Sequence, residues 1–380
     1  MKNRAVQHFA GNGASTERAW IREKRRWRAA PQNLRKFGSR PRTRQRLGVP
    51  NASSAFAPKV RELTRHISPL LFCILHFAFC IFLLGCSPKD DRSAPVESKI
   101  FRNVRVIGTR GVGIGEFNKP RSVALDAQDN LYVVDMTARV QKFSPEGVFL
   151  LQWQFPETDK GKPKGMCRDR DGNIIVIEPH YSRVNHFSTD GKLVTRWGVE
   201  GTNFGQLGMP RAGAVNSNGD IYIAEYTFSE RVQRFAAQGH KCDLSFGRLG
   251  TEPGEFSRAE GLGIDAQGRI YVADSCNHRI QVFSADGKFL RAYGRAGSAP
   301  GEFSYPYDIR IDSQGRQYVC EFGNSRIQIF DANDHLIEIL GGPGGDPGQF
   351  SNPWAIALDS KGNLYVADAI NNRVQEFLRK

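Results

Sequence analysis

The stretch RIYVADSCNHRIQVF, Arg269 to Phe283, decides the fold because the chain repeats it. Close variants are RQYVCEFGNSRIQIF from Arg316 and NLYVADAINNRVQEF from Asn363. The arginine within the stretch recurs every 44 to 48 residues, at Arg139, Arg183, Arg231, Arg279, Arg326 and Arg373. A period of about 40 to 50 residues is typical of repeat architectures, whose units bury their apolar faces against one another. The sequence therefore contains six copies of one unit.

Each copy predicts four short strands and no helix. In the sixth copy the first three strands are AIALD (355–359), LYVAD (364–368) and the alternating RVQEF (373–377). The fourth strand is exemplified by KFLRAYG (288–294) of the fourth copy. Turn residues separate the strands, and no segment keeps a helical period of 3.6. Six such units predict an all-β, six-bladed β-propeller of four-stranded antiparallel blades.

The two ends of the repeated region complement each other. The last copy stops at RVQEFLRK, after its third strand, and IFRNVRVIG (100–108) has the pattern of the missing fourth strand. We therefore expect the N-terminal strand, residues 100–108, to complete the last blade and close the ring, so that no apolar edge is left open. The propeller domain is predicted to span residues 100–380.

The net charge of +14 lies upstream of the repeats. Residues 1–85 hold 17 of the 53 basic and 3 of the 39 acidic side chains, so residues 86–380 are balanced at 36 of each. A basic tail can bind nucleic acid, but the segment that follows favours secretion instead. Residues 60–85 have the basic start and short apolar run, Leu70 to Leu84, of a signal peptide. We expect no nucleic-acid partner.

The end of this signal, Leu83-Leu84-Gly85-Cys86, resembles the bacterial lipobox. The resemblance implies that Cys86 becomes the mature N-terminus and carries a lipid that anchors the protein to a membrane of the cell envelope, facing the periplasm or the exterior. Ser87 after the cysteine favours the outer membrane where one is present. Residues 1–59 are predicted to be disordered or to result from a misassigned start near Val60, and residues 86–99 to be a flexible tether.

The repeat GEFxxPxxIAxDxxGxLYVADxxNxRIQxF resembles the NHL repeat. It appears as GEFSRAEGLGIDAQGRIYVADSCNHRIQVF (254–283) and GQFSNPWAIALDSKGNLYVADAINNRVQEF (348–377). The resemblance covers Phe101 to Lys380 and implies a β-propeller. It does not select a function, because propellers of this type include RNA-binding modules, protein-interaction modules and enzymes.

An acid at the end of each second strand precedes the repeated arginine. Since every blade has this pair, we expect it to hold the loop structure together rather than to bind a ligand. The pairs are Asp135 and Arg139, Glu178 and Arg183, Glu225 and Arg231, Asp274 and Arg279, Glu321 and Arg326, and Asp368 and Arg373.

A ligand site is expected where the copies differ. The position after the repeated proline should line the mouth of the channel, and it holds Arg121, Lys164, Arg211, Glu260, Tyr307 and Trp354. The loops between the second and third strands should lie on the same face. Cations from three successive blades and rings from two others suit an anionic or sugar-like ligand.

We therefore expect a monomeric binding module for a protein or cell-envelope glycan, with no cofactor, no metal and no catalytic residue. The alternative is a metal-dependent propeller hydrolase or lyase with an atypical channel site. The mouth position contains no histidine, and Glu260, Asp308 and His180 are the groups left for acid–base chemistry at the rim.

The lipid anchor can be tested at one residue. Cys86→Ala should abolish acylation and move the protein from the membrane fraction to soluble or uncleaved forms, because the thiol is the attachment point. Fractionation and intact mass of the purified protein measure both effects. A wild-type protein without acyl mass, fractionating like the variant, would refute the anchor.

Overall fold

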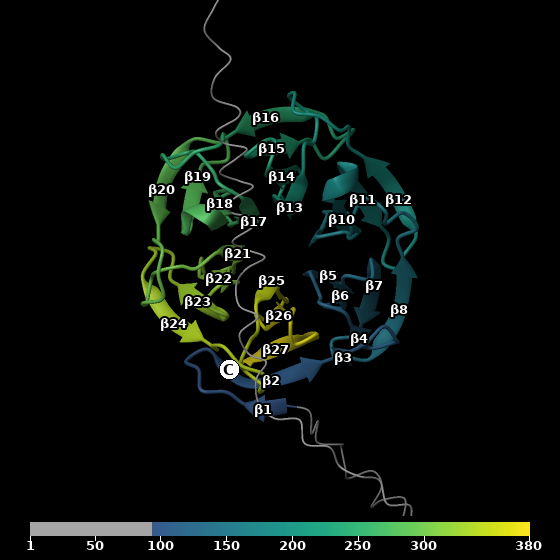
Figure 1. Ribbon diagram of the computed structural model, residues 1–380, viewed down its shortest axis with the longest axis vertical. Coiled ribbons are helices and arrows are strands. Elements are labelled where there is room, and N and C mark those ends of the chain that lie inside the picture. Colours follow the sequence, from purple (N-terminus) through teal and green to yellow (C-terminus); the bar gives the residue numbers. More distant parts are fainter. Residues whose placement is uncertain (1–92) are drawn as a thin grey trace, which may run out of the picture. The chain divides into compact units, whose positions relative to one another are not determined.

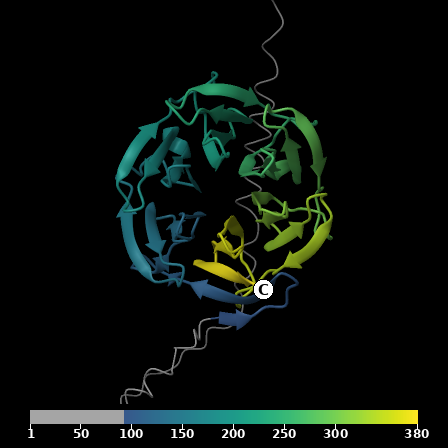
Figure 2. The ribbon, with the colours of Figure 1, turned by 180° about the vertical axis from the view of Figure 1, so that it is seen from behind.

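Six antiparallel sheets surround a central axis in the computed structural model, which describes residues 93–380 (Figure 1, and from behind in Figure 2). We number these sheets as blades 1 to 6 along the chain. Blades 1 to 3 comprise β5 (Ser122–Leu125), β6 (Leu131–Val134), β7 (Arg139–Phe143) and β8 (Phe149–Gln154); β9 (Gly165–Arg168), β10 (Ile174–Glu178), β11 (Arg183–Phe187) and β12 (Leu193–Trp197); and β13 (Pro210–Val215), β14 (Ile221–Glu225), β15 (Arg231–Phe235) and β16 (Cys242–Phe246).

Blades 4 to 6 continue the same pattern. They comprise β17 (Ala259–Ile264), β18 (Ile270–Asp274), β19 (Arg279–Phe283) and β20 (Phe289–Tyr293); β21 (Pro306–Ile311), β22 (Gln317–Glu321), β23 (Arg326–Phe330) and β24 (Leu336–Leu340); and β25 (Pro353–Leu358), β26 (Leu364–Asp368) and β27 (Arg373–Arg379), joined by β2 (Phe101–Ile107) and β1 (Ser93–Pro95). The predicted six-bladed all-β propeller of four-stranded antiparallel blades is confirmed.

Short elements complete the chain. Thr109–Arg110 (β3) and Glu116–Phe117 (β4) form a parallel pair before blade 1, and Pro179–Tyr181 (η1) and Ser275–Asn277 (η2) are single 3₁₀ turns. Over residues 93–380, no helix is long and apolar enough to cross a membrane.

The ring closes as the sequence predicts. β2 pairs with β27 in blade 6, from Phe101 opposite Arg379 to Ile107 opposite Val374. In the same blade, Glu376 accepts hydrogen bonds from Arg105 Nε at 2.7 Å and from the Tyr365 hydroxyl at 2.9 Å. Arg105 also donates to the carbonyl of Pro145 in blade 1. The closing strand thus joins the last blade to the first.

The tether prediction is wrong at its C-terminal end. β1 pairs with β2, from Ser93 opposite Arg105 to Pro95 opposite Asn103, and adds a fifth strand to blade 6. The outer edge of β2 is otherwise unpaired, and backbone groups at such an edge recruit a further strand. The predicted basic segment 1–59, the signal 60–85 and Cys86 lie outside the described residues.

The hydrophobic core lies between the blades, in six clusters that each combine residues of two neighbours. The phenylalanine of the GEF motif enters these clusters from the loop before a blade, as with the fully buried Phe256. Gly247 makes room for that ring: it has a φ of +92°, and a Cβ there would lie 2.2 Å from Phe256. The copies therefore bury their apolar faces only as a closed ring.

The repeated acid and arginine join each blade to the loop before it. In blade 4, Arg279 Nε donates to Asp274 Oδ2 at 2.8 Å, and its Nη2 donates to the carbonyls of Glu252 and Glu255 at 2.9 Å. Asp274 also accepts from the backbone N–H of Ser257 at 2.7 Å. One buried carboxylate and one guanidinium therefore satisfy several loop groups at once.

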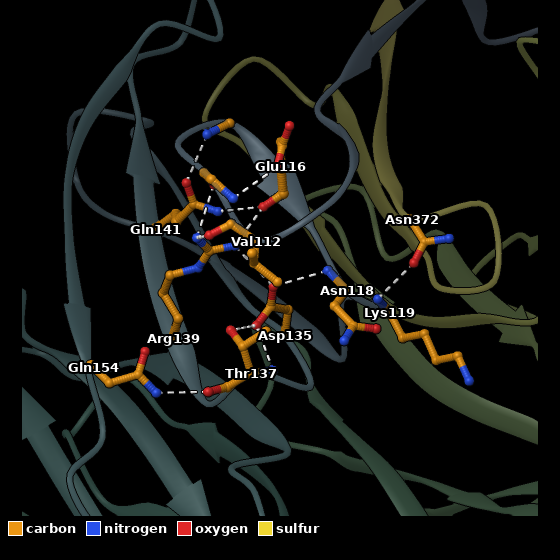
Figure 3. Close-up of polar contacts among 12 residues, drawn as sticks. Val112, Glu116, Asn118, Lys119, Asp135, Thr137, Arg139, Gln141, Gln154 and Asn372 are labelled. Atoms are coloured by element: carbon orange, nitrogen blue, oxygen red, sulfur yellow. Dashed lines mark hydrogen bonds and ion pairs between the residues drawn. The ribbon is translucent and has the colours of Figure 1, made fainter.

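The blade 1 copy shows the same arrangement in Figure 3, where Arg139 reaches the carbonyls of Val112 and Glu116 beside Asp135, and Gln141 Nε2 donates to Glu116 O at 2.7 Å. In all six blades the acid and arginine lie 2.5 to 3.3 Å apart. We call this pair with its loop contacts the blade clamp.

The clamp should stabilise the fold, and blade 4 offers a matched control. Arg279→Ala leaves the fully buried Asp274 carboxylate without its cation, which should lower the free energy of unfolding by about 3–5 kcal/mol. Arg248 pairs with Glu255 in the same loop but is 81% exposed, so Arg248→Ala should cost less than about 1 kcal/mol. Urea denaturation measures both, and equal midpoints would contradict the clamp.

Ring closure also predicts that β1 and β2 contribute unequally to the stability of the propeller. A chain that starts at Ile100 loses β1 and should melt only slightly below the full protein, because blade 6 keeps four strands. A chain that starts at Gly108 also loses β2, exposes β27 and should melt far lower or fail to fold. Circular dichroism melting curves test this. Indistinguishable curves for the two truncations would mean that β2 does not close the ring.

Candidate functional site

The six predicted mouth residues occupy equivalent places at the start of the innermost strands. Arg121 and Lys164 directly precede β5 and β9, and the other four are the second residues of their strands, as Arg211, Glu260, Tyr307 and Trp354. The innermost strands follow one another around the axis, with β25 beside β5. The structure therefore brings these side chains, which we call the mouth, to one end of the central axis.

Glu260 lies at the centre of the charged half of the mouth. Its Oε2 is 2.5 Å from Arg211 Nε and its Oε1 is 2.5 Å from Arg258 Nη2. Burial opposes ionisation of Glu260, but Arg211, Arg258 and Lys164 outweigh it and lower its pKa to about 2. The carboxylate is therefore charged at any physiological pH and is shared by two guanidinium groups.

Arg258 is a mouth residue that the sequence analysis missed. It belongs to the loop before β17 and has a φ of +61°. Its guanidinium lies 5.7 Å from the Tyr226 ring centre and 6.0 Å from that of Tyr307. The sequence did contain a sign of this difference: the fourth copy has Ala259 where every other copy has proline, and Arg258 directly precedes that alanine.

Arg121 and Lys164 differ from Arg211 because no carboxylate among the described residues pairs with them. The Arg121 guanidinium lies 4.3 Å from the Trp354 ring centre and contacts Met136 Sδ. Lys164 Nζ bonds the Tyr226 hydroxyl at 2.7 Å. These two adjacent blades therefore present positive charge that only neutral groups contact.

The pKa values of these two groups reflect that environment. Burial, followed by repulsion from Arg211, lowers the pKa of Arg121 to about 10. Burial and the charges of Arg211, Arg121 and Arg258 lower the pKa of Lys164 to about 7, although Glu260 opposes the shift. A negatively charged ligand would relieve this repulsion.

The opposite side of the mouth is aromatic. The rings of Tyr307 and Phe322 stack with centres 4.4 Å apart at 18°, and Trp354 lies 6.5 Å from Tyr307. Trp354 Nε1 and Arg258 Nε are buried nitrogens without a hydrogen-bond partner. The aromatic residues support one another and Arg121, and the two nitrogens leave hydrogen-bonding capacity unused at the mouth.

A pocket of about 260 Å³, including its open side, leads inward from the mouth. Four predicted mouth residues line it, while Arg121 and Lys164 directly precede the lining residues Ser122 and Gly165. Its lining comprises Ser122, Gly165, Met166, Arg211, Ala212, Gly213, Glu260, Tyr307, Asp308, Arg310, Trp354 and Ala355.

Asp308 and Arg310 lie in the pocket but are engaged with each other. Arg310 Nη1 donates to Asp308 Oδ1 at 2.6 Å and to the carbonyl of Leu262 at 2.8 Å. Asp308 also accepts from the backbone N–H groups of Ile309 and Ile356, and burial raises its pKa. These bonds hold the inner strands together below the mouth.

The predicted loops contribute unequally to the mouth. Met136, Tyr226 and Phe322 contact mouth residues, as described above. Burial and the charges of Lys164 and Arg121 lower the pKa of His180, which places this ring near the same cations. Ile370 is 47% exposed on blade 6. Within residues 93–380, no group of three or more His, Cys, Asp or Glu side chains is arranged to hold a metal ion.

Two family models match the chain. Residues 263–340 match a family described as a 6-bladed beta-propeller, and residues 350–377 match the NHL repeat. NHL repeat-containing protein 3 is 28% identical over 190 residues in Mus musculus and 32% identical over 187 residues in Homo sapiens. Each match covers 45% of this chain and 54% of the relative, so the chain spans about half the length of these curated relatives.

A solved structure of a gluconolactonase from Xanthomonas campestris superposes with a TM-score of 0.56. The alignment covers 76% of this chain and 97% of that chain at 15% identity, a likeness that shows the fold alone. Together with the six blades described above, these matches show that the fold is a six-bladed β-propeller and that residues 350–377 match an NHL repeat.

Proposed function

We propose that this chain is an extracytoplasmic, lipid-anchored NHL-repeat propeller that acts as a binding module for a protein or a cell-envelope glycan. Recognition takes place at the mouth, through a negatively charged group of the partner. The observation that carries the proposal is the pair of cations on blades 1 and 2, Arg121 and Lys164, which lie at a desolvated site without a carboxylate partner.

The electrostatics of the mouth favour an anion. Four cations surround one carboxylate, and Glu260 is already bonded to Arg211 and Arg258. A carboxylate or phosphate that enters between Arg121 and Lys164 meets donors whose burial Glu260 offsets only in part. Charge-assisted hydrogen bonds of this kind are about twice as strong as neutral ones.

The surroundings of the mouth suit a macromolecular partner. Phe204 and Phe228 are 61% and 70% exposed, on the two loops of blade 3 that lead to Arg211 and carry Tyr226. Exposed aromatic side chains beside a polar site are typical of binding surfaces. The anionic group is the part of the partner that enters the mouth, and these loops contact the rest of it.

Anchoring through Cys86 is part of the proposal. The lipobox-like sequence motivates it, and it would hold the propeller at a membrane of the cell envelope, in the outer membrane where one is present. The alternative of a metal-dependent hydrolase or lyase is not favoured by the gluconolactonase likeness, which extends to the fold only.

Variants of the mouth test the proposal. Glycan arrays and cell-envelope extracts identify ligands of the mature chain, and titration calorimetry then compares variants. Arg121→Ala and Lys164→Ala should each weaken binding of an acidic ligand by about 1.5–3 kcal/mol, the value of a hydrogen bond to a charged group. Binding should also weaken between pH 6 and pH 8.5, because Lys164, with its pKa of about 7, loses its charge over this range.

Two controls separate binding from folding. Arg248→Ala removes an exposed cation from the loop before blade 4 and should bind like wild type. Arg211→Ala deprives buried Glu260 of a partner and should lower the melting temperature. If the Arg121 and Lys164 variants bind every ligand as tightly as wild type, the mouth is not the site.

A further inference from the structure

Lys164 differs from lysines such as Lys142 and Lys192, which pair with a carboxylate. Lys142 Nζ lies 3.2 Å from Asp126 and Lys192 Nζ lies 2.7 Å from Asp190, so both have a counter-charge. The hydrogen-bond partner of Lys164 Nζ is the neutral Tyr226 hydroxyl, at 2.7 Å. Lys164 is half-buried, and its backbone directly precedes Gly165 in the pocket wall.

The charges that face Lys164 come from every neighbouring blade. Arg121, Arg211 and Arg258 repel its ammonium form, whereas Glu260 stabilises that form. His180 lies close enough for Lys164 to lower its pKa. Tyr226 stays protonated, because burial and Glu260 raise the pKa of its hydroxyl. Since Glu260 is shared between two arginines, repulsion and burial dominate, and about half of the Lys164 amine is unprotonated near pH 7.

We propose that Lys164 is a reactive amine that forms an imine with the carbonyl group of a small 2-oxo acid, or of a sugar acid with a free aldehyde, bound at the mouth. This inference rests on the proposed function, because the ligand's carboxylate must be held by Arg121. A lysine that is desolvated or next to other cations is the environment in which amines act as nucleophiles at neutral pH.

The reaction balances with groups that lie at the mouth. The Nζ lone pair attacks the carbonyl carbon, a C–N bond forms, and the C=O π electrons move to oxygen. A proton passes from nitrogen to that oxygen, and Tyr226, bonded to Nζ, is placed to relay it. The nitrogen lone pair then expels the hydroxyl, the C–O bond breaks, and the remaining proton on nitrogen leaves with the hydroxyl as water to give the imine. No oxidant, reductant or metal is required.

Reductive trapping tests the inference on the mature full-length protein. Incubation with pyruvate and sodium cyanoborohydride converts an imine into a stable secondary amine, which peptide mass mapping locates. At pH 7.5, Lys164 should be labelled at least about tenfold faster than Lys192, whose pKa Asp190 raises. The Lys164 rate should level off above about pH 8, whereas that of Lys192 should continue to rise.

Matched variants assign the roles. Lys164→Arg should lose the adduct while melting like wild type, and Tyr226→Phe should slow its formation. Arg121→Ala should reduce labelling by pyruvate more than labelling by the uncharged glyceraldehyde. Loss of its charge raises the pKa of Lys164 and slows both reagents, but only pyruvate also loses the partner of its carboxylate.

The outcomes separate this inference from the proposed function. Adducts spread over exposed lysines, with Lys164 no faster than Lys192, would overturn the imine while mouth variants could still lose the acidic ligand. Fast labelling of Lys164 with the same pyruvate-to-glyceraldehyde rate ratio in wild type and Arg121→Ala would overturn the 2-oxo acid as its substrate.

Discussion

The buried contact between one arginine and one carboxylate in every blade is the constraint on which the ring depends. A propeller blade has an apolar face on each side, so its stability comes from its neighbours rather than from its own strands. The blade clamp aligns each blade with the loop that leads into it, as Arg279 does for the carbonyls of Glu252 and Glu255. With its partner in place the carboxylate is satisfied, and without it a charge is left in the interior.

The clamp also explains where variation is allowed. The clamp is made by residues at the end of the second strand, at the start of the third strand and in the preceding loop. The first residues of the innermost strand do not contribute to it. Those positions differ between blades: cations in blades 1 to 3, Glu260 in blade 4 and aromatic rings in blades 5 and 6. The scaffold is therefore the same in every blade, while the side chain that each blade contributes to the mouth can vary independently.

A single carboxylate among four cations sets the chemistry of that mouth. Glu260 binds Arg211 and Arg258 and fixes them, so the excess positive charge falls on Arg121 and Lys164. The same imbalance has two consequences: it attracts an anion, and it favours the uncharged amine of Lys164 when no anion is present. Binding and reactivity at this site thus come from one electrostatic cause, burial of like charges beside a low-dielectric aromatic wall.

The sequence by itself determined the six blades, the antiparallel strands, ring closure by residues 100–108 and the candidate mouth, because each depends on spacing that a repeat displays six times. It did not predict that Ser93–Pro95 would pair with β2, since a three-residue strand has no periodicity of its own. Nor did it separate Arg211 from Arg121, which look equivalent in the repeat. Only the tertiary structure decided that Glu260 reaches Arg211 and the unforeseen Arg258, because contacts between side chains of different blades depend on distances around the ring, not along the chain.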